Sequence, residues 1–428
     1  MWRPAAQNAI DLAVFRIIVC LVVLVSADFH TAANFANLPN ELRHGVAALL
    51  TPNLAQLLHT LAVFSLSLCL IGLFSRTSAL ISLISLTLLL SLPIAAGAFR
   101  HYHHLVWFMA VLAATPCGDA LSIDRLLAVR RGKMPVILPP APACGFALDV
   151  IWLLVGALYF FPGLWKVLST GAHWPEVMLQ NMYWKWAQFN RIPSFRLDLH
   201  PLLLQLSAWS VIVFELAILP LQFVRKLRPW LILAMLSFHW GAGTFMYLSF
   251  VSLWLCYAGL FNWTPALEPL QTWVLQKLLR SNALPPVPAR PLRPIALLCA
   301  PLLAGVLWAG ITRDVFAWPF ACYPTFDVAV GQWMPRLDLF AVDAQGKSQR
   351  IPMLTGLDGQ QDWGLQWRLL QQPQTLKSWL VERAKRNLPQ NTVELQAWRV
   401  LQSTVPGRWA QTRGARLVKG VRYEHLSL

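Results

Sequence analysis

The residues best suited to chemistry in this chain are ionisable side chains inside long apolar stretches. Lys166 ends one such stretch, YFFPGLWKV, at residues 159–167. A charged group in a membrane-type helix costs free energy and usually has a partner or a function. Tyr159 and Trp165 would crowd this lysine, and loss of water favours the neutral amine that a general base needs. The structural alternative is a lysine that reaches outward to the lipid headgroups.

A group of histidines forms the second feature with chemical potential. His101, His103 and His104 follow one another in RHYHHLVWF, residues 100–108. Neutral imidazoles transfer protons and bind metals. No carboxylate or cysteine accompanies them in this segment, so a metal site is not predicted. General acid–base chemistry or a polar role at the membrane interface are the remaining interpretations.

Four further ionisable residues lie inside apolar runs: Arg16, Asp149, Glu215 and His239. We expect Arg16 to pair with Glu215 or Asp149 in the bundle interior, because buried charges need partners. His239 stands in SFHWGAGTF among small residues that allow helices to approach closely. A packing role is the simplest interpretation of His239, and a supporting role in catalysis is the alternative.

The composition identifies the elements that must position these residues. Of 428 residues, 57% are hydrophobic and only 13% are charged, and the mean hydropathy is +0.51. These values are typical of a polytopic membrane protein rather than a soluble domain. The 21 tryptophans agree, since indoles favour the membrane–water interface. The net charge of +16 fits basic loops beside an anionic leaflet, and no nucleic-acid-binding motif is present.

The apolar runs predict an all-α polytopic membrane helix bundle with about nine spans, two of them short. The expected spans are 10–28, 54–74, 78–98, 103–116, 146–167, 201–223, 229–248, 250–263 and 294–312. The first is expected to be a retained span rather than a signal peptide, because it contains Arg16 and no small-residue cleavage site follows it.

Lysine and arginine in the short loops predict the orientation. Basic residues cluster at 130–133, at 225–228 and between Lys277 and Arg290. With nine spans these loops and the N-terminus lie on the cytoplasmic side. Lys166, the histidines 101–104 and everything after about residue 312 then face outward, which we expect to be the outside of a bacterial inner membrane.

The chain divides into three parts by composition. Residues 1–263 form the transmembrane core, and residues 264–312 contain an irregular Pro-rich linker and the last span. Residues 313–428 are polar enough for a small α+β extramembrane domain. That domain is predicted to contain a hairpin over 334–354 with its turn at 344–346, a helix over 376–388 and a strand over 393–402.

The order of motifs resembles the horizontally transferred transmembrane domain family, whose members include the vitamin K-dependent gamma-carboxylases. The resemblance covers roughly residues 9–263. Its pieces are LAVFRI (12–17), IGLFSRTS (71–78), HYHHLVW (101–107), GDALSIDRLL (118–127), YFFPGLWKV (159–167), FELAILPLQF (214–223) and SFHWGAGTF (237–245).

The resemblance implies a reaction and roles for two residues. It implies that Lys166 is the base that deprotonates reduced vitamin K or menaquinol, which O2 then converts to an epoxide. It also implies that a strong base formed in this reaction removes a proton from a glutamate, which captures CO2. The assisting histidine falls on His103, with Trp107 at the family's spacing, while His101 and His104 remain alternatives. The implied partners are a quinol, the lipid bilayer and an exported protein or peptide.

Three departures from the family pattern limit what is expected. Pro162 replaces a small residue, Trp165 stands in place of a second basic residue, and the outer region after residue 312 is short. Epoxidation is therefore the less demanding expectation, and carboxylation of a tagged protein the more demanding one. A non-catalytic membrane module that binds an exported peptide or a redox protein is the alternative. A transporter ranks last, because the chain shows no inverted repeat.

Overall fold

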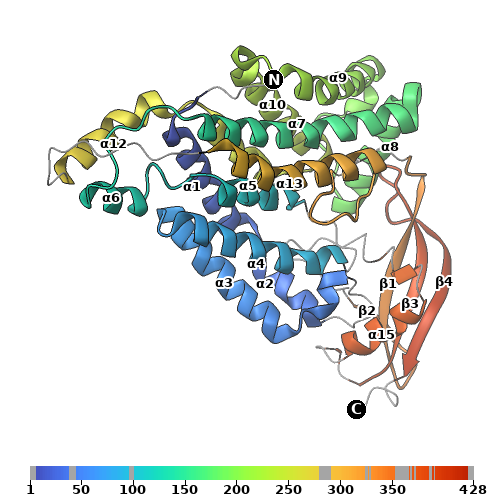
Figure 1. The fold of residues 1–428 in the computed structure, drawn as a ribbon. Coiled ribbons are helices and arrows are strands. Elements are labelled where there is room, and N and C mark those ends of the chain that lie inside the picture. The colour runs from blue at the N-terminus through green and yellow to red at the C-terminus, as the bar shows by residue number, and fades with distance from the viewer. Residues whose placement is uncertain are drawn as a thin grey trace.

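The computed structural model of the chain is mostly helical, with a small sheet near the C-terminus (Figure 1). The residues that it describes are 6–37, 45–95, 101–278, 291–322, 326, 329–351, 366, 369–370, 373–384, 388–389 and 391–422.

The long helices form one bundle. Among the residues that the structure describes, six stretches are long and apolar enough to cross a membrane, and the fourth of these, Pro142–Phe189, joins α7 to α8. The helices in these six stretches are α1 (Ala9–Ser26), α3 (Pro52–Ile71), α4 (Ser75–Ala95), α7 (Pro142–Thr170) with α8 (Trp174–Phe189), α9 (Pro201–Leu221) and α13 (Leu292–Thr312).

The expected count of about nine spans is not confirmed. The fourth and eighth expected spans correspond to α5 (His103–Ala114) and to the segment Val251–Leu260, which are apolar but shorter than a bilayer requires. The seventh corresponds to α10 (Arg228–Met246), which is long but contains several polar residues. The structure therefore confirms apolar helices of membrane type, six of which have the length of a full crossing among the described residues.

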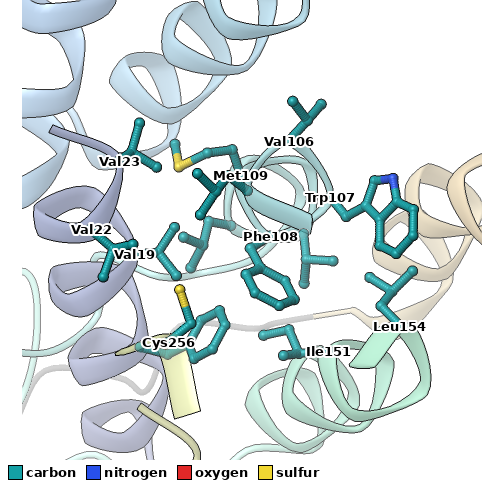
Figure 2. Packing of buried hydrophobic residues seen from close by; sticks show 14 of the residues in the cluster. Val19, Val22, Val23, Val106, Trp107, Phe108, Met109, Ile151, Leu154 and Cys256 are labelled. Carbon is teal, nitrogen blue, oxygen red and sulfur yellow. The ribbon is translucent and has the colours of Figure 1, made fainter. Parts of the chain in front are cut away.

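The centre of the bundle is a continuous apolar core around α5. Figure 2 shows Phe108 of α5 among side chains from α1, α7 and the Val251–Leu260 segment, including Val19, Ile151 and Cys256. The rings of Phe15 and Phe108 meet edge to face, with centroids 5.1 Å apart. Although short, α5 is almost fully buried and fixes the position of the histidines at its first turn.

Small residues let α7 and α9 approach closely. A Cβ added at Gly163 would lie 2.7 Å from the Cβ of Glu215, and one at Gly156 would lie 2.6 Å from Nε2 of Gln222. These two glycines are seven residues apart, so both lie on the same face of α7. Close approach through small residues is a common way for membrane helices to pack.

The basic loops gather at one end of the bundle. The N-terminal segment pairs with the chain before α7 through Gln7 and Ala141. Asn8 donates a hydrogen bond to Glu268 in α12 (Thr264–Leu278), and α12 packs beside α6 (Ile123–Arg130). Figure 1 shows α6 and α12 at the end of the molecule opposite the C-terminal sheet. The arrangement agrees with the prediction that these loops share a side.

Several loops contain helices that were not expected. α6 begins at Ile123 with Ser122 as its N-cap, whose hydroxyl accepts a hydrogen bond from the amide of Arg125. α8 occupies part of the loop expected over 168–200, and α12 occupies residues 264–278 of the linker expected to be irregular. That expectation is wrong for these residues, where Pro269 lies inside a helix. The Pro-rich part over 279–290, with Arg280 and Arg290, lies outside the described residues.

In the described residues, the C-terminal domain is an antiparallel sheet on which the helix α15 packs. Its strands are β1 (Trp333–Asp343), β2 (Ser348–Ile351), β3 (Thr392–Ser403) and β4 (Thr412–Arg422), and α15 spans Pro373–Ala384. The spatial order is β2-β1-β3-β4. The expected hairpin, helix and strand are confirmed where the residues are described, whereas β4 was not predicted. Leu376, Trp379 and Leu380 of α15 pack on the sheet as one core.

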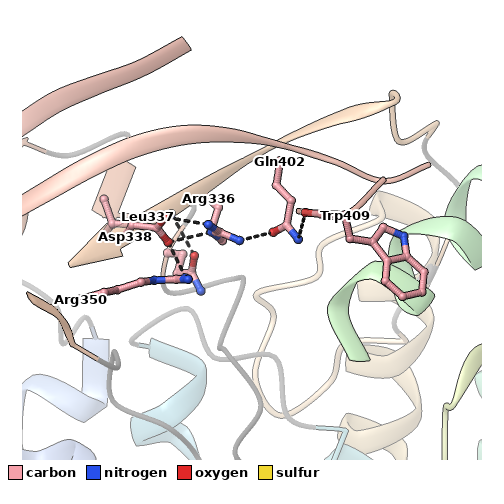
Figure 3. A network of polar contacts seen from close by, with 7 residues as sticks. Arg336, Leu337, Asp338, Arg350, Gln402 and Trp409 are labelled. Atoms are coloured by element: carbon pink, nitrogen blue, oxygen red, sulfur yellow. Dashed lines mark hydrogen bonds and ion pairs between the residues drawn. The ribbon is translucent and has the colours of Figure 1, made fainter. Parts of the chain in front are cut away.

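A charged network ties the sheet together, as Figure 3 shows. Asp338 of β1 accepts hydrogen bonds from Arg336 and from Arg350 of β2, at 2.7–2.8 Å. Arg336 also donates to the side chain of Gln402 in β3, whose amide donates to the carbonyl of Trp409. Asp338 is 6% exposed, so its carboxylate depends on these partners.

Asp338→Asn is expected to destabilise the C-terminal domain selectively. Loss of the charge weakens three hydrogen bonds to guanidinium groups, for a cost of about 1–3 kcal/mol. Limited proteolysis should cleave the sheet faster in this variant while the helix bundle keeps its thermal midpoint. Lys347→Gln, in the exposed turn between β1 and β2, is the matched control. Equal proteolysis of the Asp338→Asn variant and the wild type would contradict a structural role for the network.

Candidate functional site

A cavity of about 500 Å³ lies within the bundle, lined by the C-terminal half of α7 and by α8 to α10. Figure 1 shows that α8 lies toward the C-terminal sheet. Four of the sequence motifs line it: those at 101–107, 159–167, 214–223 and 237–245. The ionisable and phenolic residues that they contribute are His101, His103, His104, Tyr159, Lys166, Glu215 and His239. Most of the remaining wall is apolar and includes Phe214, Phe238 and Met178. The cavity therefore combines an apolar volume with a few polar groups, which is typical of a small-molecule site.

Lys166 and Glu215 form a buried ion pair in the wall of this cavity. The Nζ atom of Lys166 lies 2.6 Å and 2.7 Å from the two carboxylate oxygens of Glu215. Both side chains are only 4% exposed. The interpretation of Lys166 as a lysine that reaches toward the headgroups is wrong, because the ammonium points into the bundle. An isolated charge here would be very costly, so each group needs the other.

The local sequence explains how the pair is positioned. Gly163 lies one turn before Lys166 on α7 and leaves room for the backbone and side chain of Glu215 on α9. The Trp174 ring lies 5.3 Å from Nζ of Lys166, within cation–π range. Trp165, which was expected to crowd Lys166, instead donates a hydrogen bond to the carbonyl of Gly310 on α13.

The three neighbouring histidines all reach the cavity. The His103 ring meets Trp318 edge to face at 4.5 Å, and the His101 ring meets Phe250 at 5.1 Å. His104 is also buried, and its Nε2 has no hydrogen-bond partner among the described residues. The expectation that these histidines and Lys166 share one site agrees with the cavity lining. Position alone does not single out His103.

His239 belongs to a hydrogen-bonded cluster rather than to simple packing. Its Nε2 lies 2.8 Å from the hydroxyl of Tyr159 and 3.1 Å from that of Tyr257. The two tyrosine hydroxyls are 2.5 Å apart. All three side chains are buried, and Tyr159 and His239 line the cavity. The sequence did not predict this cluster, because Tyr159, His239 and Tyr257 come from three different elements and meet only through tertiary packing.

The pairing expected for Arg16 is wrong. Its guanidinium donates to the carbonyls of Cys117 and Leu121, at 2.6 Å and 2.7 Å, and so ties α1 to the chain before α6. Gly72 ends α3 against this guanidinium, with φ of 68° that a side chain would strain. Backbone carbonyls, not a carboxylate, are thus the hydrogen-bond partners of the two terminal nitrogens of Arg16.

Asp149 also has different partners from those expected. Its carboxylate accepts hydrogen bonds from Arg225 and Arg228, both at 2.7 Å. These arginines come from the basic connection between α9 and α10, so the ion pairs hold the N-terminal part of α7 against that connection. Asp149 is structural and does not line the cavity: about nine residues of helix, or roughly 14 Å, separate it from Leu158, the first cavity residue of α7.

The cavity reaches the surface of the bundle between α9 and α10. Ser210 of α9 and Ser237 of α10 line it and are exposed. The surrounding surface is apolar, with Leu206 and Val213 on α9 and Leu233 on α10 at least half exposed. This opening therefore faces the surface that the hydrocarbon of a bilayer would cover.

A polar turn closes the rim between α8 and α9. Asp198 accepts hydrogen bonds from Arg196 at 2.6 Å and 2.8 Å and from the hydroxyl of Tyr183 at 3.0 Å. Burial raises the pKa of the Asp198 carboxyl, but these hydrogen bonds and the guanidinium charge lower it, and the net shift is downward. The charged turn holds Leu197 against the cavity.

The described residues contain no group of three side chains suited to hold a metal ion. Comparison with protein-family models, with curated proteins and with solved structures finds no match.

Proposed function

We propose that this protein is an integral membrane enzyme that oxygenates a lipophilic quinol, with the Lys166–Glu215 pair as its proton acceptor. The observation that carries the proposal is the meeting of four dispersed motifs at one apolar cavity that opens between α9 and α10. A quinol dissolved in the bilayer can enter through such an opening without crossing water. The resemblance to the vitamin K-dependent carboxylases supports the same class of substrate.

The buried pair suits deprotonation of a neutral phenol. Lys166 and Glu215 together carry no net charge, and neither does a bound quinol. When the phenolic O–H bond breaks, the proton passes to the carboxylate of Glu215, while the ammonium of Lys166 stabilises the phenolate oxygen. The site stays neutral throughout, which avoids the cost of a net charge in a low-dielectric interior. In this scheme Glu215 takes the proton and Lys166 stabilises the anion, which differs from the resemblance, in which the lysine itself is the base.

The overall reaction balances with oxygen as the oxidant. One quinol and one O2 give one quinone epoxide and one water: one oxygen atom enters the ring and the other leaves with the two quinol protons. The histidines at 101–104 lie where they can donate or accept protons during these steps. Carboxylation would add a second substrate, in which a glutamate γ C–H bond breaks and a C–C bond to CO2 forms.

The proposal includes a topology. The end of the bundle with α6, α12 and the Arg225–Arg228 connection is cytoplasmic, and the cavity and C-terminal domain face outward. This topology requires α5, α10 and the Val251–Leu260 segment to complete crossings inside the bundle, for nine in all. Such short segments are tolerated where protein surrounds them. A bacterial inner membrane, with menaquinol as the available quinol, fits this arrangement.

The test is formation of quinone epoxide by purified protein in lipid nanodiscs. Reduced menaquinone with a short prenyl tail is supplied with ¹⁸O2, and the product is identified by mass spectrometry. The expected result is a labelled epoxide, which Lys185→Met also forms, because Lys185 lies on α8 outside the cavity lining. Absence of epoxide with the wild-type protein would overturn the proposal.

A second function is favoured by one observation in the C-terminal domain. β4 lies at the edge of the described sheet and carries Arg413, Arg416 and Lys419. A basic edge strand can pair with an extended acidic peptide. A non-catalytic module would capture such an exported peptide, and crosslinks to it would survive Lys166→Ala.

A further inference from the structure

The cavity contains a second polar group that the proposed reaction does not yet use. Tyr159, His239 and Tyr257 hydrogen-bond to one another at 2.5–3.1 Å. Tyr159 and His239 line the cavity, whereas Tyr257 lies behind them. Buried polar clusters of this kind are costly unless every member finds its hydrogen bonds.

Its position relative to Lys166 is set by α7. Tyr159 and Lys166 are seven residues apart and lie on the same face, with Cα atoms separated by about 10 Å along the helix. Pro162 lies between them and also lines the cavity. The two polar groups therefore lie at opposite ends of one apolar wall.

Aromatic rings enclose the end occupied by Tyr159. Phe214 and Phe238 stack on each other with centroids 5.0 Å apart, and both meet the Tyr159 ring edge to face, at 5.3 Å and 5.7 Å. Phe214 comes from α9 and Phe238 from α10, so the rings join the two helices that flank the opening. A flat aromatic ligand would find apolar surface here between two hydrogen-bonding ends.

The cluster still has hydrogen-bonding capacity. Each tyrosine hydroxyl offers two acceptor lone pairs and one donor. The Nδ1 atom of His239 is buried without a hydrogen-bond partner among the described residues. The cluster can therefore bond one more oxygen atom from a ligand in the cavity.

We infer that the cavity binds a ring with oxygen atoms at opposite ends, such as a 1,4-quinol or the matching quinone, through both polar groups at once. One oxygen meets Lys166 and Glu215, and the other meets Tyr159 and His239. The Cα atoms of Tyr159 and Lys166 are about 10 Å apart along α7. A six-membered ring with para oxygens, with a hydrogen bond of about 2.8 Å at each end, has a similar length. Tyr159 and His239 are then positioning residues, and Tyr257 orients Tyr159. The inference rests on the proposed function and specifies how its substrate is held.

The experiment measures equilibrium binding to the full-length protein in nanodiscs with two probes. One is short-tailed menaquinone, which has two ring oxygens, and the other is the same ring system with a single hydroxyl. The single oxygen will choose the Lys166 end, because hydrogen bonds to charged groups are the stronger ones. Tyr159→Phe removes one hydroxyl and leaves the ring in place. It is expected to weaken menaquinone binding by about fivefold to tenfold and to leave the single-hydroxyl probe unchanged.

Tyr247→Phe is the matched control, because Tyr247 follows α10 and does not line the cavity. His239→Gln, which retains a hydrogen-bonding group, should lose less affinity for menaquinone than His239→Leu. A loss of the same size for both probes would show a purely structural role for Tyr159, and no loss for either would show that the cluster does not meet the ligand. Either outcome overturns the inference.

Failure of the inference and failure of the proposed function give different results. If Tyr159→Phe weakens menaquinone binding alone, as expected, but the wild type forms no epoxide, the binding mode stands and the proposed reaction falls. If the wild type forms epoxide but Tyr159→Phe binds both probes normally, the binding mode alone falls. Absence of menaquinone binding by the wild type overturns both.

Discussion

Lys166→Met is expected to reduce epoxide formation at least a hundredfold and to destabilise the bundle. Removing one group that stabilises a developing oxyanion lowers the rate by about 10²–10³-fold. The same change leaves the Glu215 carboxylate buried without its partner, which costs about 3–5 kcal/mol. The measurements are labelled epoxide yield in nanodiscs and the thermal midpoint in detergent. Because both quantities fall, this variant alone does not separate chemistry from folding.

The double variant Lys166→Met with Glu215→Leu makes that separation. Replacing both members of a buried ion pair with apolar groups of similar volume is often neutral or stabilising. The thermal midpoint is therefore expected to return to that of the wild type, while epoxide formation stays absent. Lys185→Met should change neither quantity appreciably. A stable double variant that still forms epoxide would show that the ion pair only holds α7 and α9 together.

Gly163→Ala is expected to produce the second-largest effect, although the residue contributes no functional group. Its new Cβ would lie 2.7 Å from the Cβ of Glu215 and 3.3 Å from the backbone nitrogen of Leu216. The backbone of α9 cannot yield as a flexible side chain would, so the helices must separate. We expect a loss of about 1–3 kcal/mol from overpacking. Epoxide formation should fall by roughly tenfold to a hundredfold, because small displacements of catalytic groups are costly.

Gly243→Ala on α10 provides the control for this substitution. A Cβ there would meet only the carbonyl oxygen of Leu248, at an ordinary distance of 3.8 Å. Stability and epoxide yield should stay near wild-type values. If Gly163→Ala behaved like Gly243→Ala, the close approach of α7 and α9 would have no importance for the ion pair.

Much of the bundle was predictable from the sequence, because long apolar runs indicate helices that lie in lipid. The expected spans at 10–28, 54–74 and 294–312 match α1, α3 and α13 closely. The unexpected helices α6, α8 and α12 are shorter or more polar: α6 has only eight residues, three of them charged, and α8 and α12 mix Pro, Trp and charged residues that also occur in loops. β4 was missed because its glycines and basic residues obscure the alternation of a strand.

The sequence predicted most of the residues in the site, but not which of them pair with one another. Lys166 and Glu215 were each recognised as costly buried charges, but which helix faces which depends on tertiary packing that spacing along one chain does not show. Asp149 illustrates the problem, since its partners come from a basic loop that was interpreted only as a topology signal. One usable signal was present: Gly156 and Gly163 mark the face of α7 that meets α9, and Tyr159 and Lys166 repeat the same seven-residue spacing.

Because the cavity opens between α9 and α10, its occupancy depends on the concentration of the ligand in the membrane. A molecule that enters from the bilayer is counted by its mole fraction among lipids, not by its amount in bulk water. Half-saturation would then shift when the ratio of lipid to protein changes at fixed total ligand, and adding inert lipid would act as dilution. The length of the ligand's tail would change its partitioning into the membrane without any change in the residues that line the cavity. A cell could thus regulate occupancy of the site through membrane composition alone.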